Sequence, residues 1–101
     1  MIDLKAKQKE VFQNKLNKGF PIDDINREFC YLYGEVAEAF DAYRLKKDDL
    51  SEELADIVIF TLGIAEMLDI DLEDSLMKKI DKNNKRVYIK NEKGVLVKEG
   101  E

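Results

Sequence analysis

Residues 49–68 read DLSEELADIVIFTLGIAEML, and this stretch decides the fold class. The run Ile57–Phe60 taken alone would suit a β-strand, because β-branched and aromatic residues favour strands. The whole stretch is too long for one strand, and its apolar residues recur every three or four positions. Asp49 followed by Glu52 also resembles a capping box, which marks the start of a helix. We therefore predict a helix that follows Asp49 and ends at about Leu68.

Three further helices are expected around this one. Apolar spacing predicts them over residues 3–17, about 24–45 and about 71–86. Asp23 or Asp24 is expected to cap the second and Asp71 the last, and Gly19 is placed to end the first. The second has an apolar stripe made of Phe29, Leu32, Val36, Phe40 and Tyr43. The last has a narrow stripe made of Leu72, Leu76 and Ile80.

The C-terminal residues have a different pattern. Two short apolar runs flank Asn91–Gly94, which is typical of a small hairpin or a flexible tail.

The prediction for the whole chain is an all-α fold, a four-helix bundle in which the second and third helices are antiparallel. A length of 101 residues predicts a single domain, with a helical core over about 3–86 and a tail over 87–101.

Composition excludes several classes of partner. The net charge of -5 and the pI near 4.9 argue against a nucleic-acid binder, which usually carries a basic excess. No apolar run approaches 18 residues, so no membrane span is expected. A single cysteine cannot form an intramolecular disulfide, which indicates an intracellular, cytoplasmic protein.

The absence of histidine removes whole chemistries. Ser-His-Asp and Cys-His catalysis and histidine zinc sites are excluded, and one cysteine cannot build a thiolate site. Any metal must therefore be bound by oxygen ligands, which select hard ions such as Mg²⁺ or Mn²⁺.

Two acid pairs are candidates for that role. Glu35 and Glu38 are three residues apart on one predicted helix, and Glu53 and Asp56 are three apart on the next, so each pair lies on one helix face. Antiparallel packing would bring four carboxylates together, where they repel unless a divalent cation binds them. Two alternatives stay open: solvated helix faces, and a structural salt bridge to Asp56, the only charge in an otherwise apolar stretch.

A cationic stripe lies on the last predicted helix. Lys79, Asn83 and Arg86 follow the i, i+4, i+7 spacing and share one face. Such a face suits phosphate oxygens. The alternative is a solvated basic helix end.

The helix after Asp49 is apolar nearly all round. Its apolar surface is larger than the other helices of a four-helix monomer can cover, so a homodimer or a dimer of dimers is expected.

The order of these motifs is informative. Glu35 and Glu38 are followed after a gap of 14 residues by Glu53 and Asp56, and then by the cationic stripe. The sequence segments around these motifs fit the same pattern; they are Gly34–Ala39, Glu52–Val58 and Ile70–Asp74. Over about residues 24 to 90 the chain resembles the MazG-like family of all-α nucleoside triphosphate pyrophosphohydrolases.

The resemblance implies an activity and roles for these residues. Glu35, Glu38, Glu53 and Asp56 would form the catalytic Mg²⁺ site. Lys79, Asn83 and Arg86 would hold the phosphates of a nucleoside triphosphate or close the site. The substrate would be cleaved between the α and β phosphates to a monophosphate and pyrophosphate. This reaction removes unwanted nucleotides from the cellular nucleotide pool.

One departure concerns a further carboxylate that would act as the general base or as a ligand of a second metal ion. Many members of the family carry a glutamate just before the Gly-Glu dipeptide that corresponds to Gly34–Glu35. In this chain Tyr31–Tyr33 occupies that place. Glu28 is a candidate substitute. Two relatives with the same helical core are less similar: phosphoribosyl-ATP pyrophosphatases usually have a histidine after the second acid pair, and dimeric dUTPases are longer. The alternative of another class is a non-catalytic helical interaction module, either a degenerate relative or a toxin–antitoxin partner.

Overall fold

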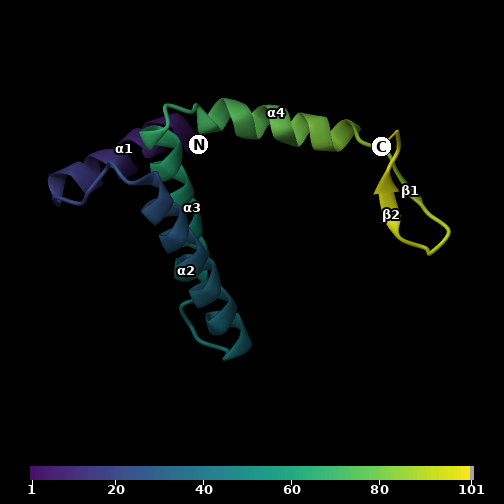
Figure 1. Ribbon diagram of the computed structural model, residues 1–101, viewed down its shortest axis with the longest axis horizontal. Helices are drawn as coiled ribbons and strands as arrows, with labels where there is room; N and C mark the ends of the chain where they lie inside the picture. Colours follow the sequence, from purple (N-terminus) through teal and green to yellow (C-terminus); the bar gives the residue numbers. More distant parts are fainter. Residues whose placement is uncertain (101) are drawn as a thin grey trace.

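A computed structural model describes residues 1–100 as four helices followed by a two-stranded hairpin (Figure 1). The elements are α1 Leu4–Asn17, α2 Ile25–Arg44, α3 Leu50–Met67, α4 Leu72–Lys85, β1 Tyr88–Lys90 and β2 Leu96–Lys98. The four predicted helices and the all-α class are confirmed. The C-terminal residues form the hairpin rather than a tail, with Ile89 opposite Val97 in an antiparallel pair.

Aspartates cap three of the helices, and two of them, Asp24 and Asp71, do so as the sequence predicts. The side chains of Asp3, Asp24 and Asp71 each accept a hydrogen bond from the backbone N–H three residues ahead, which satisfies a free helix-end donor. Asp49 differs, because it stands before α3 but its side chain makes no capping hydrogen bond. The capping box predicted there is wrong, although the helix does begin at Leu50.

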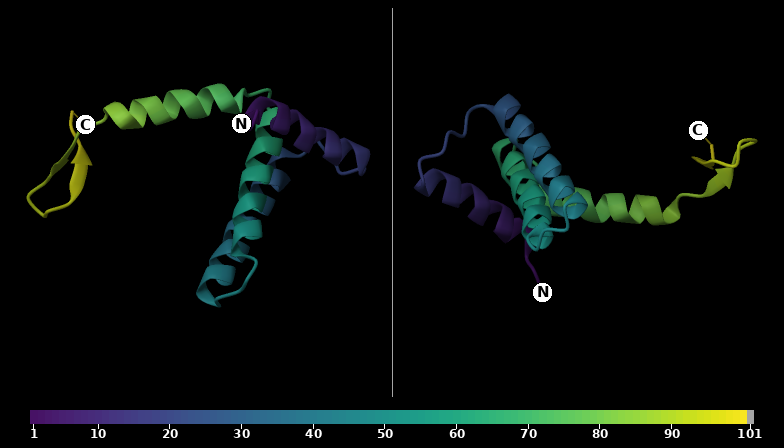
Figure 2. Two further views of the ribbon diagram at one scale, coloured as in Figure 1. Left: turned by 180° about the vertical axis from the view of Figure 1, so that it is seen from behind. Right: turned by 90° about the horizontal axis from the view of Figure 1, so that it is seen from below.

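The helices α2 and α3 form an antiparallel hairpin, and α1 packs across α3 (Figure 2). Gly63 of α3 lies against α1, since a Cβ there would lie 3.7 Å from Val11 Cγ1. The buried apolar side chains gather around this crossing and between the two hairpin helices; they are Ala39, Ala42, Leu62, Ile64 and Ala65. The core is therefore small, and its buried apolar side chains come from α2 and α3.

Gln8 joins three helices through polar contacts. Its buried amide nitrogen donates to Glu66 Oε1 at 3.1 Å and to the Ile70 carbonyl at 2.7 Å. Its amide oxygen accepts from the Leu72 backbone N–H at 3.3 Å. Glu73 Oε1 accepts in turn from the Leu4 N–H at 3.0 Å. These bonds fix the first turn of α4 against α1.

The fourth helix then leaves the other three. Beyond its first turn, α4 projects away from the α2–α3 hairpin and carries the β-hairpin at its far end (Figure 1). The overall dimensions of 54 × 35 × 31 Å reflect this projection. One chain therefore does not close the predicted four-helix bundle. We call residues 1–71 the body and residues 72–100 the arm.

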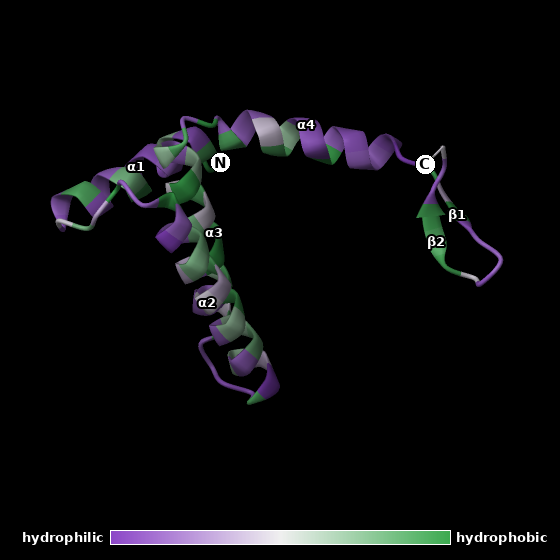
Figure 3. Ribbon diagram, in the orientation of Figure 1, coloured by the Kyte–Doolittle hydropathy of each residue, from purple (hydrophilic) through white to green (hydrophobic). Residues whose placement is uncertain are grey.

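The predicted apolar stripe of α2 lies mostly on the surface. Phe29, Val36, Phe40 and Tyr43 are exposed, whereas Ala39 and Ala42 fill the contact with α3. Figure 3 shows apolar residues along both hairpin helices, while α4 is largely hydrophilic. The stripe is uncovered because the single chain has only one helix to place against α2. Within residues 1–100, none of the helices has the length and apolar character that a membrane crossing requires.

Candidate metal centre

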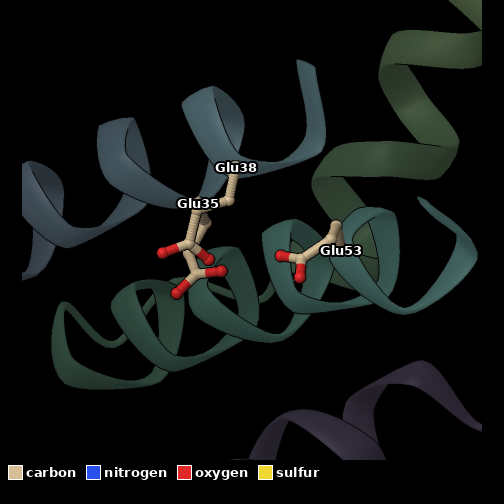
Figure 4. Close-up of side chains that lie close together, drawn as sticks. All are labelled: Glu35, Glu38 and Glu53. Atoms are coloured by element: carbon tan, nitrogen blue, oxygen red, sulfur yellow. The ribbon is translucent and has the colours of Figure 1, made fainter. Parts of the chain in front are cut away.

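Antiparallel packing brings three predicted acids together. Glu35 and Glu38 extend from α2 and Glu53 extends from α3 toward them (Figure 4). One carboxylate oxygen from each residue lies within 4.8 Å of the other two. Two oxygens bound to one cation at about 2.0–2.6 Å are at most about 5 Å apart. The separation is therefore of the size that a single divalent cation can bridge.

Asp56 lies next to this group. It is half-buried on α3, one turn after Glu53. It does not belong to the three-carboxylate group, yet its negative charge contributes to raising the pKa of both Glu35 and Glu53. The structure thus places three of the four predicted acids in one cluster and the fourth at its border.

The electrostatics of the cluster are those of crowded like charges. Partial burial raises the pKa of Glu35 above its ordinary value of 4.5, and the charges of Glu38, Asp56 and Glu53 add to the effect. Burial also raises the pKa of Glu53, followed by the charges of Glu38 and Asp49. All the charged groups that produce these shifts are carboxylates, so the site favours a bound cation.

Unpartnered oxygens support the same conclusion. Glu35 Oε2, Glu53 Oε2 and Asp49 Oδ1 are buried and accept no hydrogen bond within the described residues. A buried carboxylate oxygen without a donor is costly, and a coordinated cation relieves that cost. An all-oxygen donor set fits Mg²⁺ or Mn²⁺.

Asp49 is an acid near Glu53 that the sequence analysis did not count among the candidate ligands. The sequence analysis assigned it to helix capping, which it does not perform. It stands four residues before Glu53, so the two lie on the same side of the chain at the start of α3. That spacing was the signal that could have placed it with the acids.

Glu28 does not take the place of the absent family glutamate. Its Oε1 lies 2.7 Å from Lys15 Nζ, and its side chain is 5% exposed. A carboxylate held in a buried ion pair is a structural partner of α1 rather than a free base.

The predicted cationic stripe lies elsewhere in the chain. Lys79 and Asn83 are on α4, and Arg86, at its C-terminal end, donates from Nη1 to Asn83 Oδ1 at 3.1 Å. Because α4 points away from the hairpin, one chain does not bring these residues to the acids (Figure 1).

A cleft opens on the α1 side of the hairpin, and the clustered acids are not among the residues that line it. It has a volume of about 850 Å³ and lies between α1 and the α2–α3 hairpin. Tyr31 and Phe60 line it, with ring centroids 6.4 Å apart in an edge-to-face pair. Tyr31 is one helical turn before Glu35 and Phe60 is one turn after Asp56, so the aromatic pair adjoins the cluster.

Comparison with known proteins identifies the family. The model of the MazG-like family matches residues 19–101, which include α2, α3, α4 and the hairpin. The chain belongs to the MazG-like family, as the acid pairs and their spacing predict. No curated protein and no solved structure matches the chain.

Proposed function

We propose that the protein is a Mg²⁺-dependent nucleotide pyrophosphohydrolase. It would cleave a ribo- or deoxyribonucleoside triphosphate to the monophosphate and pyrophosphate, and so remove unwanted nucleotides from the nucleotide pool. The observation that carries the proposal is the convergence of Glu35, Glu38 and Glu53 within 4.8 Å. Membership of the MazG-like family supports the proposal, because members of that family are typically hydrolases of this kind.

The roles of the acids follow from their positions. Glu35, Glu38, Glu53 and Asp56 would hold Mg²⁺, with Mn²⁺ as a substitute. When bound, the ion supplies charge neutralisation at the phosphate oxygens. Water attacks phosphorus, and the bond to the oxygen that bridges the α and β phosphates breaks to release pyrophosphate. A carboxylate of the cluster takes the proton of the water, since no histidine is available.

The cleft and the cationic stripe complete the substrate site. The edge-to-face pair of Tyr31 and Phe60 offers an apolar surface for the nucleoside beside the acids. Lys79, Asn83 and Arg86 would bind the phosphates, because guanidinium and ammonium groups match phosphate oxygens.

The active form is proposed to be a homodimer or a dimer of dimers. On α2, Phe29, Val36 and Phe40 continue at heptad spacing and are 43%, 48% and 60% exposed. Leu54 and Val58 on α3 are exposed as well. Helical geometry places Phe29, Val36 and Phe40 on the side of α2 away from Glu35 and Glu38. Two hairpins joined through this side form the four-helix core that one chain lacks.

The direct test is hydrolysis by the purified full chain. A panel of canonical and damaged ribo- and deoxyribonucleoside triphosphates is incubated with Mg²⁺, and the monophosphate and pyrophosphate are measured. We expect both products in equal amounts from at least one substrate, and none in EDTA. Binding of nucleotides without any release of pyrophosphate would contradict the proposal and favour a non-catalytic binding module.

A further inference from the structure

We propose that Asp49 is a further cation-binding residue of the metal centre, and that its carboxylate acts beside Glu53 from one turn earlier on α3. This role rests on the proposed function for the identity of the ion, and it adds a residue to the site of that ion. Three features of Asp49 support it, namely an unused capping position, a buried oxygen without a donor, and a shared helix face with Glu53.

The first feature is the contrast between Asp49 and the other aspartates at helix starts. Asp3, Asp24 and Asp71 accept a hydrogen bond from a backbone N–H at 3.0, 3.0 and 3.1 Å, and Asp49 accepts none. The angle ψ lies between 89° and 98° at the three capping residues, whereas it is 14° at Asp49. The side chain of Asp49 is therefore not used by its own helix, although aspartate is a favoured capping residue.

The second feature is a buried oxygen that no other part of the chain satisfies. Asp49 Oδ1 is buried and has no hydrogen-bond partner in the part of the chain that the structure describes. Lys46 and Lys47, the cations nearest to it in the sequence, are exposed and form no ion pair within residues 1–100. A buried carboxylate oxygen without a donor is costly, and a bound cation offsets that cost.

The third feature is the position of Asp49 on α3. The helix begins there, since the Asp49 carbonyl accepts from the Glu53 N–H at 3.0 Å. At 100° per residue, Asp49, Glu53 and Asp56 fall within an arc of about 60°. Glu53 extends from this face toward the acids of α2 (Figure 4). Asp49 is thus on the same face as the acids of α3, at the end of the row nearest the start of the helix.

Two consecutive turns of this face each present an unpartnered oxygen. Glu53 Oε2 is buried without a hydrogen-bond partner, as Asp49 Oδ1 is. The two residues also interact electrostatically. Burial raises the pKa of Glu53 most, the charge of Glu38 adds to the effect, and the charge of Asp49 comes next. A cation near Glu53 therefore also neutralises the charge of Asp49.

The separation of Asp49 from the other acids defines how it can act. Four residues of helix correspond to about 6 Å along the axis, and Asp49 lies outside the group of three oxygens within 4.8 Å. Mg²⁺ usually keeps several of its waters. A carboxylate one turn away can therefore bind the hydrated ion through one of these waters, and loss of such a partner typically weakens metal binding about 10- to 100-fold.

Titration of the full chain with Mg²⁺ in a calorimeter, without nucleotide, tests the proposal. Asp49→Asn removes the charge and keeps the size of the side chain, and we expect it to raise the Kd for Mg²⁺ about tenfold or more. Asp48→Asn is the matched control, because it removes the same charge from the exposed neighbouring residue. It should leave the Kd nearly unchanged, since salt screens exposed charges. Equal Kd values for the two variants would overturn the proposal.

Thermal melts distinguish cation binding from a capping role in solution. In EDTA, Asp49→Asn should melt at or above the temperature of wild type, because a like charge beside Glu53 is removed. It should also gain less from added Mg²⁺ than wild type does. Asp24→Ala, which removes a real cap, should melt lower in EDTA and keep the gain. If Asp49→Ala behaves like Asp24→Ala, Asp49 is a cap and the proposal is wrong.

Both measurements are independent of catalysis. If wild type binds Mg²⁺ and Asp49→Asn binds it more weakly, but no nucleotide releases pyrophosphate, the proposed function fails and the role of Asp49 stands. If wild type hydrolyses a nucleotide with Mg²⁺ and Asp49→Asn binds the ion as tightly as wild type, the proposed function stands and the role of Asp49 is refuted.

Discussion

Lys15 Nζ lies 2.7 Å from Glu28 Oε1, in an ion pair that ties α1 to the first turn of α2. The two side chains are 17% and 5% exposed. The helix α1 makes its main helix contacts with α3 and α4, and this pair adds a contact with α2. It also lines the cleft between α1 and the α2–α3 hairpin. The pair therefore holds the wall of the proposed nucleoside site in place.

Glu28→Ala should lower the free energy of unfolding by about 3 kcal/mol, because it leaves a largely buried ammonium group without its partner. Urea denaturation measures the change. Glu10→Ala, which removes the exposed pair of Lys7 and Glu10, is the control and should change stability little. A variant at Glu28 that keeps full stability but loses hydrolysis would show that Glu28 belongs to the catalytic group after all.

Asp56→Ala should lower pyrophosphate release by about 100-fold or more, because the metal loses part of its transition-state stabilisation. Thermal melts with and without Mg²⁺ separate this role from a structural one. Wild type should melt at a higher temperature with Mg²⁺, and Asp56→Ala should lose that gain. Glu52→Ala, an exposed acid on the same helix, should retain it. A large loss of stability in EDTA would identify Asp56 as a structural partner instead.

The metal-free protein should lose stability as the pH rises from about 4.5 toward neutrality. Burial and like charges raise the pKa of Glu35 and of Glu53 above their ordinary value of 4.5. Each carboxyl therefore binds its proton more tightly in the folded chain than in the unfolded one. Over the window between the ordinary and the raised pKa, the free energy of unfolding decreases with pH. Denaturation in EDTA at a series of pH values measures this slope.

Two controls define the origin of that slope. Glu35→Gln should flatten it, and saturating Mg²⁺ should reverse it, because the cation binds the ionised carboxylates. The Asp74 backbone N–H, with Lys5, lowers the pKa of Asp71 below 3.8. The stability that Asp71 contributes is lost only at still lower pH. A slope that Glu35→Gln leaves unchanged would place its source outside the acid cluster.

Phe40→Glu should dissociate the oligomer, because it places a charge in the exposed apolar stripe of α2. Light scattering at micromolar concentration measures the mass. Ala37→Glu, exposed on the same helix but outside the stripe, should leave the mass unchanged. Wild type that is already a monomer at this concentration would refute the homodimer.

The sequence was most informative where the structure is local. Helix starts at Asp24 and Asp71 were predictable because a cap needs only the residues three positions ahead. The pairing of Glu35 with Glu53 was also predictable, since two consecutive helices joined by a short connection pack antiparallel.

The direction of α4 was not predictable in this way. It depends on Gln8, a residue 64 positions before Leu72, and no periodic pattern marks such a contact. The exposure of Phe40 has a similar explanation, because spacing identifies an apolar face but not the molecule that covers it. Asp49 was assigned to capping because the same residue type serves both as a cap and as a ligand.

The hydrogen bonds of Gln8 at the start of α4 set the direction of the whole arm. With α4 about 21 Å long, a tilt of about 10° at Gln8 would move its far end by about 4 Å. That displacement exceeds the length of a hydrogen bond. A substitution at Gln8 would therefore displace Arg86 at the far end of α4, which is one of the residues proposed to bind phosphate.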